Sequence, residues 1–142
     1  MQTPVQDIQV EIVGKGVARA TVRVAAYPQV GKHWREQLTG ANAKKWGRIY
    51  CDPSGVEKDK RRKEHMSDYG GIIEDKNTRK HGKGHINRDE CPGAMFIWQT
   101  QEPADVEELC ATDNQNLGRD LYWALKRVLG KLDWWEVQFR FR

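Results

Sequence analysis

The uneven placement of large apolar side chains constrains this chain more than any other feature of its sequence. The chain has 28 Leu, Ile, Val and Phe residues and six Trp residues, but residues 52–93 hold only four of the 28 and none of the Trp. The same segment carries 10 Lys or Arg and 9 Asp or Glu residues. Such a segment cannot bury enough apolar surface to offset the entropy that it loses when it is ordered. We therefore expect two core-forming arms, residues 1–51 and 94–142, which fold together around a charged, Gly-containing insertion at 52–93.

The two arms predict one domain, residues 1–142. A length of 142 residues is close to the ~150 that one domain usually occupies, and each arm alone would be small for a stable core. The three cysteines cannot all pair within one chain, and we see neither a secretory signal nor an apolar run long enough to span a bilayer. We therefore expect a cytoplasmic protein without a membrane association.

Alternation of apolar and polar residues predicts most of the strands. Residues 5–13 and 17–26 alternate on either side of a short glycine turn, which predicts a β-hairpin. Residues 94–100 are apolar on both faces, as expected for a central strand, and residues 134–141 alternate as a C-terminal strand. The segments between them predict one or two short helices over 31–46, a short strand at 48–51, a solvated helix over 57–68 and an irregular loop over 69–92.

A leucine-rich stripe predicts the longest helix. Asp113 or Asn114 can cap it, so we expect a helix over 114–131, and Pro103 favours a further short helix that carries Val106 and Leu109. Together the elements predict an α+β fold, in which a mainly antiparallel sheet is packed by the long helix. The residues of the stripe are Leu117, Leu121, Leu125, Val128, Leu129 and Leu132.

The basic residues suggest a polyanionic partner. The formal net charge is +4, and cations that adapt to a phosphate backbone release its condensed counterions. On the sheet face opposite the long helix, arginines beside an aromatic such as Trp98 would hold nucleic acid by charge and stacking. The competing interpretation is a solvated surface of mixed charge, with Phe96 and Trp98 buried beneath residues 34–46. The candidate nucleic-acid-binding residues are Arg19, Arg23, Lys58, Lys60, Arg61, Arg62, Lys63, Arg79, Lys80, Lys83, Trp98 and Arg140.

Two other groups of residues leave alternatives open. His81, His85, Cys51 and Cys91 include metal-ligand types, but only the two histidines have a spacing typical of a zinc site. The acidic cluster over 102–113, followed by Asp120, suits either a Mg²⁺-dependent nuclease or the first turns of helices. We predict no catalytic residue, metal or cofactor.

The leading hypothesis is therefore a non-catalytic module that binds RNA or DNA. The alternatives are a protein-interaction or assembly protein that uses the insertion, and a Mg²⁺-dependent nuclease that uses the carboxylates around 102–120. We also expect residues 57–90 to be mobile, with Ile72 and Ile73 as their one buried contact.

Overall fold

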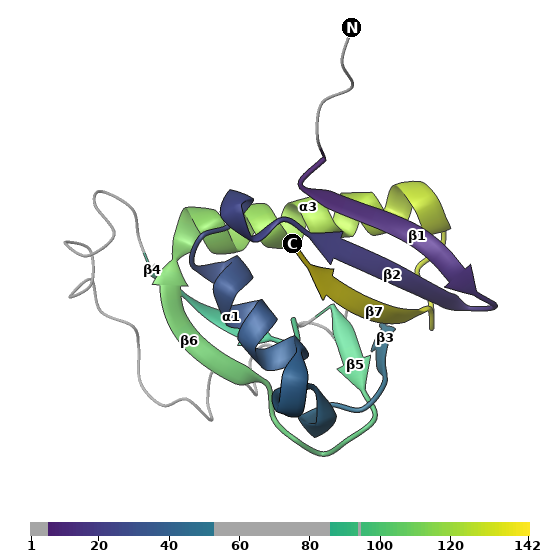
Figure 1. Cartoon of the computed structure of the whole chain (residues 1–142), viewed down its shortest axis with the longest axis horizontal. Coiled ribbons are helices and arrows are strands. Elements are labelled where there is room, and N and C mark those ends of the chain that lie inside the picture. The colour runs from purple at the N-terminus through teal and green to yellow at the C-terminus, as the bar shows by residue number, and fades with distance from the viewer. Residues whose placement is uncertain (1–5, 53–85, 94) are drawn as a thin grey trace, which may run out of the picture.

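The computed structural model of the chain describes residues 6–52, 86–93 and 95–142, and Figure 1 shows their arrangement. The predicted helix over 57–68, the contact at Ile72 and Ile73, and the candidate residues between 58 and 83 lie outside these ranges. No helix in the described ranges is long and apolar enough to cross a membrane. In chain order the elements are β1 (Ile8–Gly14), β2 (Val17–Val22), η1 (Val24–Ala26), α1 (Val30–Leu38), η2 (Gly40–Lys45), β3 (Ile49–Cys51), β4 (Ile86–Cys91), β5 (Phe96–Trp98), β6 (Asp105–Cys110), α3 (Ala111–Leu129) and β7 (Glu136–Phe141).

The strands form two sheets. Five strands lie in the order β1-β2-β7-β3-β5, and β4 and β6 form a separate antiparallel pair. The predicted hairpin is confirmed, with Ile8 opposite Val22 and Gly16 in the left-handed conformation (φ 70°) that its turn needs. Its second strand ends at Val22 rather than at residue 26, because Val24–Ala26 form the 3-10 helix η1. β7 runs parallel to β2 and antiparallel to β3. The mainly antiparallel α+β fold predicted from the sequence is therefore confirmed.

One face of the five-stranded sheet is covered by both helices. Ala20 of β2 lies opposite Phe139 of β7, so the two side chains share a face, and the Phe139 ring packs against Trp34 of α1 at 5.9 Å. α3 packs along β1 on that same face. Leu117, Leu121 and Leu125 of α3 are completely buried there, which is why the leucine stripe predicted this helix correctly.

Three predictions in the C-terminal half were wrong in part. The strand predicted over 94–100 is β5, which is shorter and lies at the edge of the sheet rather than at its centre. The short helix predicted around Val106 and Leu109 is the strand β6, and residues 86–91 of the predicted mobile loop are its partner β4. Pairing between β4 and β6 joins segments distant in sequence, and it outweighs the local preference for a helix after Pro103.

The long helix also differs from its predicted limits of 114 and 131. It begins at Ala111, with Cys110 as its N-cap residue, and ends at Leu129 before Gly130, whose φ is 72°. Val128, which the stripe placed in the core, is 40% exposed.

Leu121→Ala should therefore lower the free energy of unfolding by ~2–5 kcal/mol, because the substitution leaves a cavity where the side chain was completely buried. Val128→Ala on the same helix should cost less than about 1 kcal/mol, because its side chain is already partly in water. Urea denaturation of the two variants measures both values. Equal losses would contradict this packing of α3.

Candidate functional sites

A buried histidine lies where α1 meets the second sheet. His33 is 2% exposed, and its Nδ1 lies 2.5 Å from a carboxylate oxygen of Asp89 in β4. Its Nε2 lies 2.6 Å from a carboxylate oxygen of Asp105 in β6, and Glu107 of β6 approaches to 3.7 Å. Because both ring nitrogens face carboxylate oxygens, both donate, and the ring is an imidazolium. Trp34 donates its indole N–H to the same Asp89 carboxylate at 3.1 Å.

The pKa values of this cluster follow from burial and charge. Burial alone would lower the pKa of His33, but the hydrogen bonds and charges of Asp89, Asp105 and Glu107 raise it to about 9. Burial raises the pKa of Asp89 to about 6, against the opposing effect of His33 and Trp34. At neutral pH the cluster therefore holds a charged imidazolium between carboxylates, with no ring nitrogen left to accept a proton. It fastens α1 to β4 and β6 and is not arranged as a general base.

The acidic cluster predicted over 102–113 does not converge on one point. Asp105 and Glu107 face His33, whereas Asp113 accepts hydrogen bonds from the backbone N–H groups of Gln29 and Val30, each at 2.8 Å. Asp120 accepts a hydrogen bond from the Tyr27 hydroxyl, with 2.6 Å between the two oxygens. In the described part of the chain, no group of three or more His, Cys, Asp or Glu residues is placed to hold a metal ion. Cys51 and Cys91 are buried in different strands, while His81 and His85 lie outside the described residues.

The face of the five-stranded sheet that points away from the helices, which we call the open face, carries the arginines predicted within residues 1–51. The register places Arg19 beside Gln138 and Thr21 beside Arg140, all on the face away from the helices. Arg19, however, forms an ion pair with Glu11 of β1 at 3.4 Å. Arg23, just after β2, contacts Asp7 through both Nε (3.0 Å) and Nη2 (2.5 Å). These pairs neutralise part of the charge on which the predicted site depends.

The predicted stacking residue lies on the other face. Phe96 is completely buried, and Trp98 points to the same, helix-covered side of β5. The Trp98 ring packs edge-on against Trp46 at 5.8 Å, and its indole N–H donates to the Glu102 carbonyl at 2.7 Å. Of the residues of β3 and β5, only Tyr50 and Ile97 lie on the open face.

A surface that the sequence analysis did not single out lies on the outer side of α3. Its residues Arg119, Tyr122, Trp123, Lys126 and Arg127 are spaced three and four apart, so they share the helix face that points away from the sheet. All are exposed, Trp123 by 56% and Tyr122 by 39%, and the two rings meet edge-on at 5.2 Å. We call these five residues the outer face of α3. The helical spacing was visible in the sequence, but the same pattern is common on ordinary solvated helices.

The outer face of α3 is positively charged because, in the part of the chain that the structure describes, only Arg119 of its three cations contacts a carboxylate. Asp113 and Asp120 are the helix's two acidic residues. Asp113 binds the first turn of α1, and Asp120 is shared between Tyr27 and Arg119, the latter at 3.2 Å. Among residues 6–52, 86–93 and 95–142, Lys126 and Arg127 have no carboxylate partner.

Replacing His33 with Asn should lower the free energy of unfolding by ~3–5 kcal/mol at neutral pH, because Asp89 would stay buried without its partner. The folded-state pKa of His33 is raised from 6.5 to about 9. The stabilisation is therefore complete below the unfolded value of 6.5 and is lost as the pH rises through 9.

Urea denaturation of the wild type and the His33→Asn variant, from neutral pH to about pH 10, measures this dependence. The cost of the substitution should shrink toward the alkaline end. Glu36→Gln, an exposed change on the same helix, is the control and should show a constant, small effect. A His33→Asn cost that does not change with pH would show that the imidazolium is not the stabilising form.

No family model matches the chain, and no curated protein matches it. What the chain binds is therefore inferred from its own side chains.

Proposed function

We propose that this protein is a cytoplasmic module, without catalysis of its own, that binds single-stranded nucleic acid on the outer face of α3. The observation that carries the proposal is the exposure of Tyr122 and Trp123 among three cations. The three free thiols, Cys51, Cys91 and Cys110, are compatible with a reducing compartment.

The charge of this face favours a phosphate backbone. Lys126 and Arg127 lie in the last turn of α3, where cations also stabilise the helix dipole. The dipole accounts for cations at this end, but it does not account for Arg119 on the same face four residues before Trp123. A row of cations on one helix face matches a polyanion that runs along the helix.

The aromatic residues favour a single strand over a duplex. Trp123 leaves 56% of its surface in water, so its ring is available to stack on a partner. Stacking of an unpaired base on such a ring is worth ~1–3 kcal/mol, and every base can stack. In a duplex the faces of the bases are already stacked on one another and are not accessible to Trp123.

The outer face of α3 and the open face of the sheet point away from each other, because α3 covers the opposite face of that sheet. One short strand therefore contacts only one of the two surfaces. We place it on α3. Arg19 and Arg23 on the sheet side are both paired with carboxylates, Glu11 and Asp7. On α3 only Arg119 is paired, with Asp120, and Lys126 and Arg127 have no carboxylate partner among the described residues. The role of Arg140, and of the candidate cations between 58 and 83, stays a prediction.

Trp123→Ala should weaken binding of a labelled single-stranded oligonucleotide about 5- to 150-fold, which corresponds to the removal of one stacked base. The double variant Lys126→Gln/Arg127→Gln should reduce the slope of log affinity against log salt by roughly 1.4, or about 0.7 for each phosphate that is no longer neutralised. Fluorescence anisotropy over a salt series measures both quantities.

Matched control variants test whether a loss of binding is specific to the outer face of α3 or follows from losing any exposed indole or cation. Trp134→Ala removes another exposed indole, and Lys44→Gln/Lys45→Gln removes two exposed cations at the end of η2. Both controls should bind as the wild type does. Loss of binding in Arg19→Gln/Arg140→Gln, with no loss in the α3 variants, would overturn the proposal and return the site to the open sheet face. Binding that does not depend on salt would exclude a nucleic-acid backbone as the ligand.

A further inference from the structure

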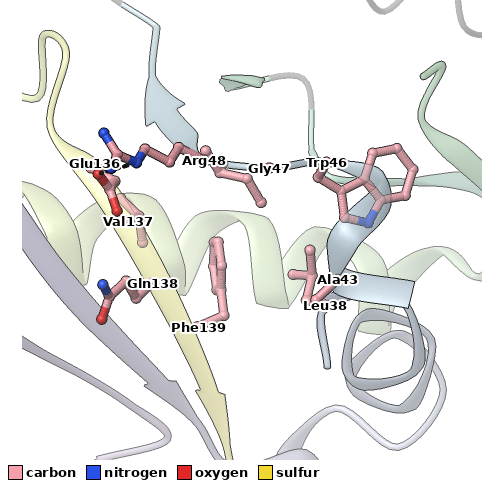
Figure 2. A pocket seen from close by; sticks show the side chains of 10 residues that line it. Leu38, Ala43, Trp46, Gly47, Arg48, Glu136, Val137, Gln138 and Phe139 are labelled. Carbon is pink, nitrogen blue, oxygen red and sulfur yellow. Dashed lines mark ion pairs between the residues drawn. The ribbon is translucent and has the colours of Figure 1, made fainter. Parts of the chain in front are cut away.

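A small hollow lies between β7 on one side and α1 and η2 on the other, away from the outer face of α3. In Figure 2, Phe139 of β7 lies on one side of the hollow, and Leu38 and Ala43 lie on the other. Its volume is about 180 Å³. That is smaller than the ~300–1,000 Å³ of a pocket for a whole drug-sized ligand, so it fits one ring system rather than a complete cofactor.

The lining of the hollow is mixed, with slightly more polar than apolar surface. Leu38, Trp46 and Phe139 line it and belong to the hydrophobic core or pack against it. The Trp46 indole is held by a hydrogen bond to the Gln37 carbonyl (2.9 Å) and by its edge-on contact with Trp98. A flat ring that enters therefore meets surfaces that are already in place.

The backbone of β7 adds hydrogen-bonding groups at this edge. Glu136 and Arg142 direct their N–H groups to β2, to the carbonyls of Gly16 and Val22. Because successive residues of a strand alternate, Phe139 directs its N–H and C=O to the opposite edge, which borders the hollow. β3 pairs with β7 there only through Tyr50 and Glu136, and of the described strands no other lies along that edge.

The free edge is too short for an added peptide strand. α1 packs against β7 beyond the hollow, with the Trp34 ring 5.9 Å from that of Phe139. What the edge can take is a small planar group that carries a donor beside an acceptor.

Polar side chains at the mouth select the rest of the ligand. Arg48 is 67% exposed and makes only a loose contact with Glu136, at 3.9 Å, which leaves its guanidinium available to an anion. Gln138 also lines the hollow, and its position in β7 places it on the open face of the sheet. The hollow therefore combines apolar side chains on part of its lining, a backbone donor and acceptor at its edge, and an arginine outside.

We propose that this hollow binds the base of a nucleotide, with Phe139 hydrogen-bonding the edge of the base and Arg48 meeting the phosphate. The base of a nucleotide supplies flat apolar faces and an adjacent donor and acceptor. The phosphate of the nucleotide supplies the anion. The site stands apart from the outer face of α3 and does not depend on the function proposed for that face.

Isothermal titration calorimetry with AMP tests the site in the full-length chain. Ala43→Leu fills the hollow and should weaken AMP binding at least about tenfold, whereas Ala41→Leu, the same change at an exposed position of η2, should not. Arg48→Gln should weaken AMP about tenfold and leave adenosine unchanged, because adenosine has no phosphate. Ribose 5-phosphate, which has no base, should not bind.

A parallel titration with oligo(dA) distinguishes two sources of the bound base, a free nucleotide and a nucleic acid. If AMP does not bind but oligo(dA) does, and Ala43→Leu weakens the oligo(dA) binding, the base belongs to a nucleic acid. If AMP binds, the ligand is a free nucleotide. AMP binding must survive Trp123→Ala, so failure of the α3 site and failure of this site give different results. The proposal would be overturned if neither AMP nor oligo(dA) showed binding that Ala43→Leu weakens.

Discussion

The architecture depends on the ionic cluster at His33. Its two carboxylate partners come from β4 and β6, so a single imidazolium joins α1 to the whole second sheet. The neighbouring Trp34 binds the same Asp89 and also packs on Phe139 of the main sheet. Adjacent residues of one helix therefore connect the two sheets. Burying these charges is tolerable only because each has a close partner, which makes the position of α1 specific.

A second set of contacts locks the starts of the two helices together. Asp113 of α3 accepts hydrogen bonds from the N–H groups of Gln29, the N-cap residue of α1, and of Val30, its first residue. In return, the side-chain amide oxygen of Gln29 accepts a hydrogen bond from the N–H of Cys110, the N-cap residue of α3. Each helix thus satisfies backbone donors of the other, which a helix end requires. In this arrangement the Asp113 carboxylate of α3 is bound to backbone N–H groups, and the Asp120 carboxylate is bound to the Tyr27 hydroxyl. The positive charge of the outer face of α3 is therefore a consequence of how the interior is tied together.

The hollow at β7 has a similar origin in the packing of the sheet. β3 meets β7 at one residue pair, Tyr50 and Glu136, and the chain before β3 turns away through Gly47, whose φ is 67°. α1 and η2 occupy the space that a longer β3 would have filled. The gap that remains is lined by side chains of all these elements, and it opens beside Arg48.

Local periodicity in the sequence was sufficient for the hairpin of β1 and β2, for the buried leucines of α3 and for β7, because alternation and helical spacing identify an element and its buried face. It did not identify β4 or β6, since a strand whose partner lies distant in the chain carries charged residues that are equally compatible with a loop or a helix. Nor could it assign roles to His33 and Asp113. Their partners lie 56 to 84 positions away, and no spacing rule connects side chains over that range. The sequence by itself determined which segments have a buried face; the tertiary structure alone decided which carboxylates are neutralised inside and which cations are left on the surface, because charge pairing depends on distance in space and not along the chain.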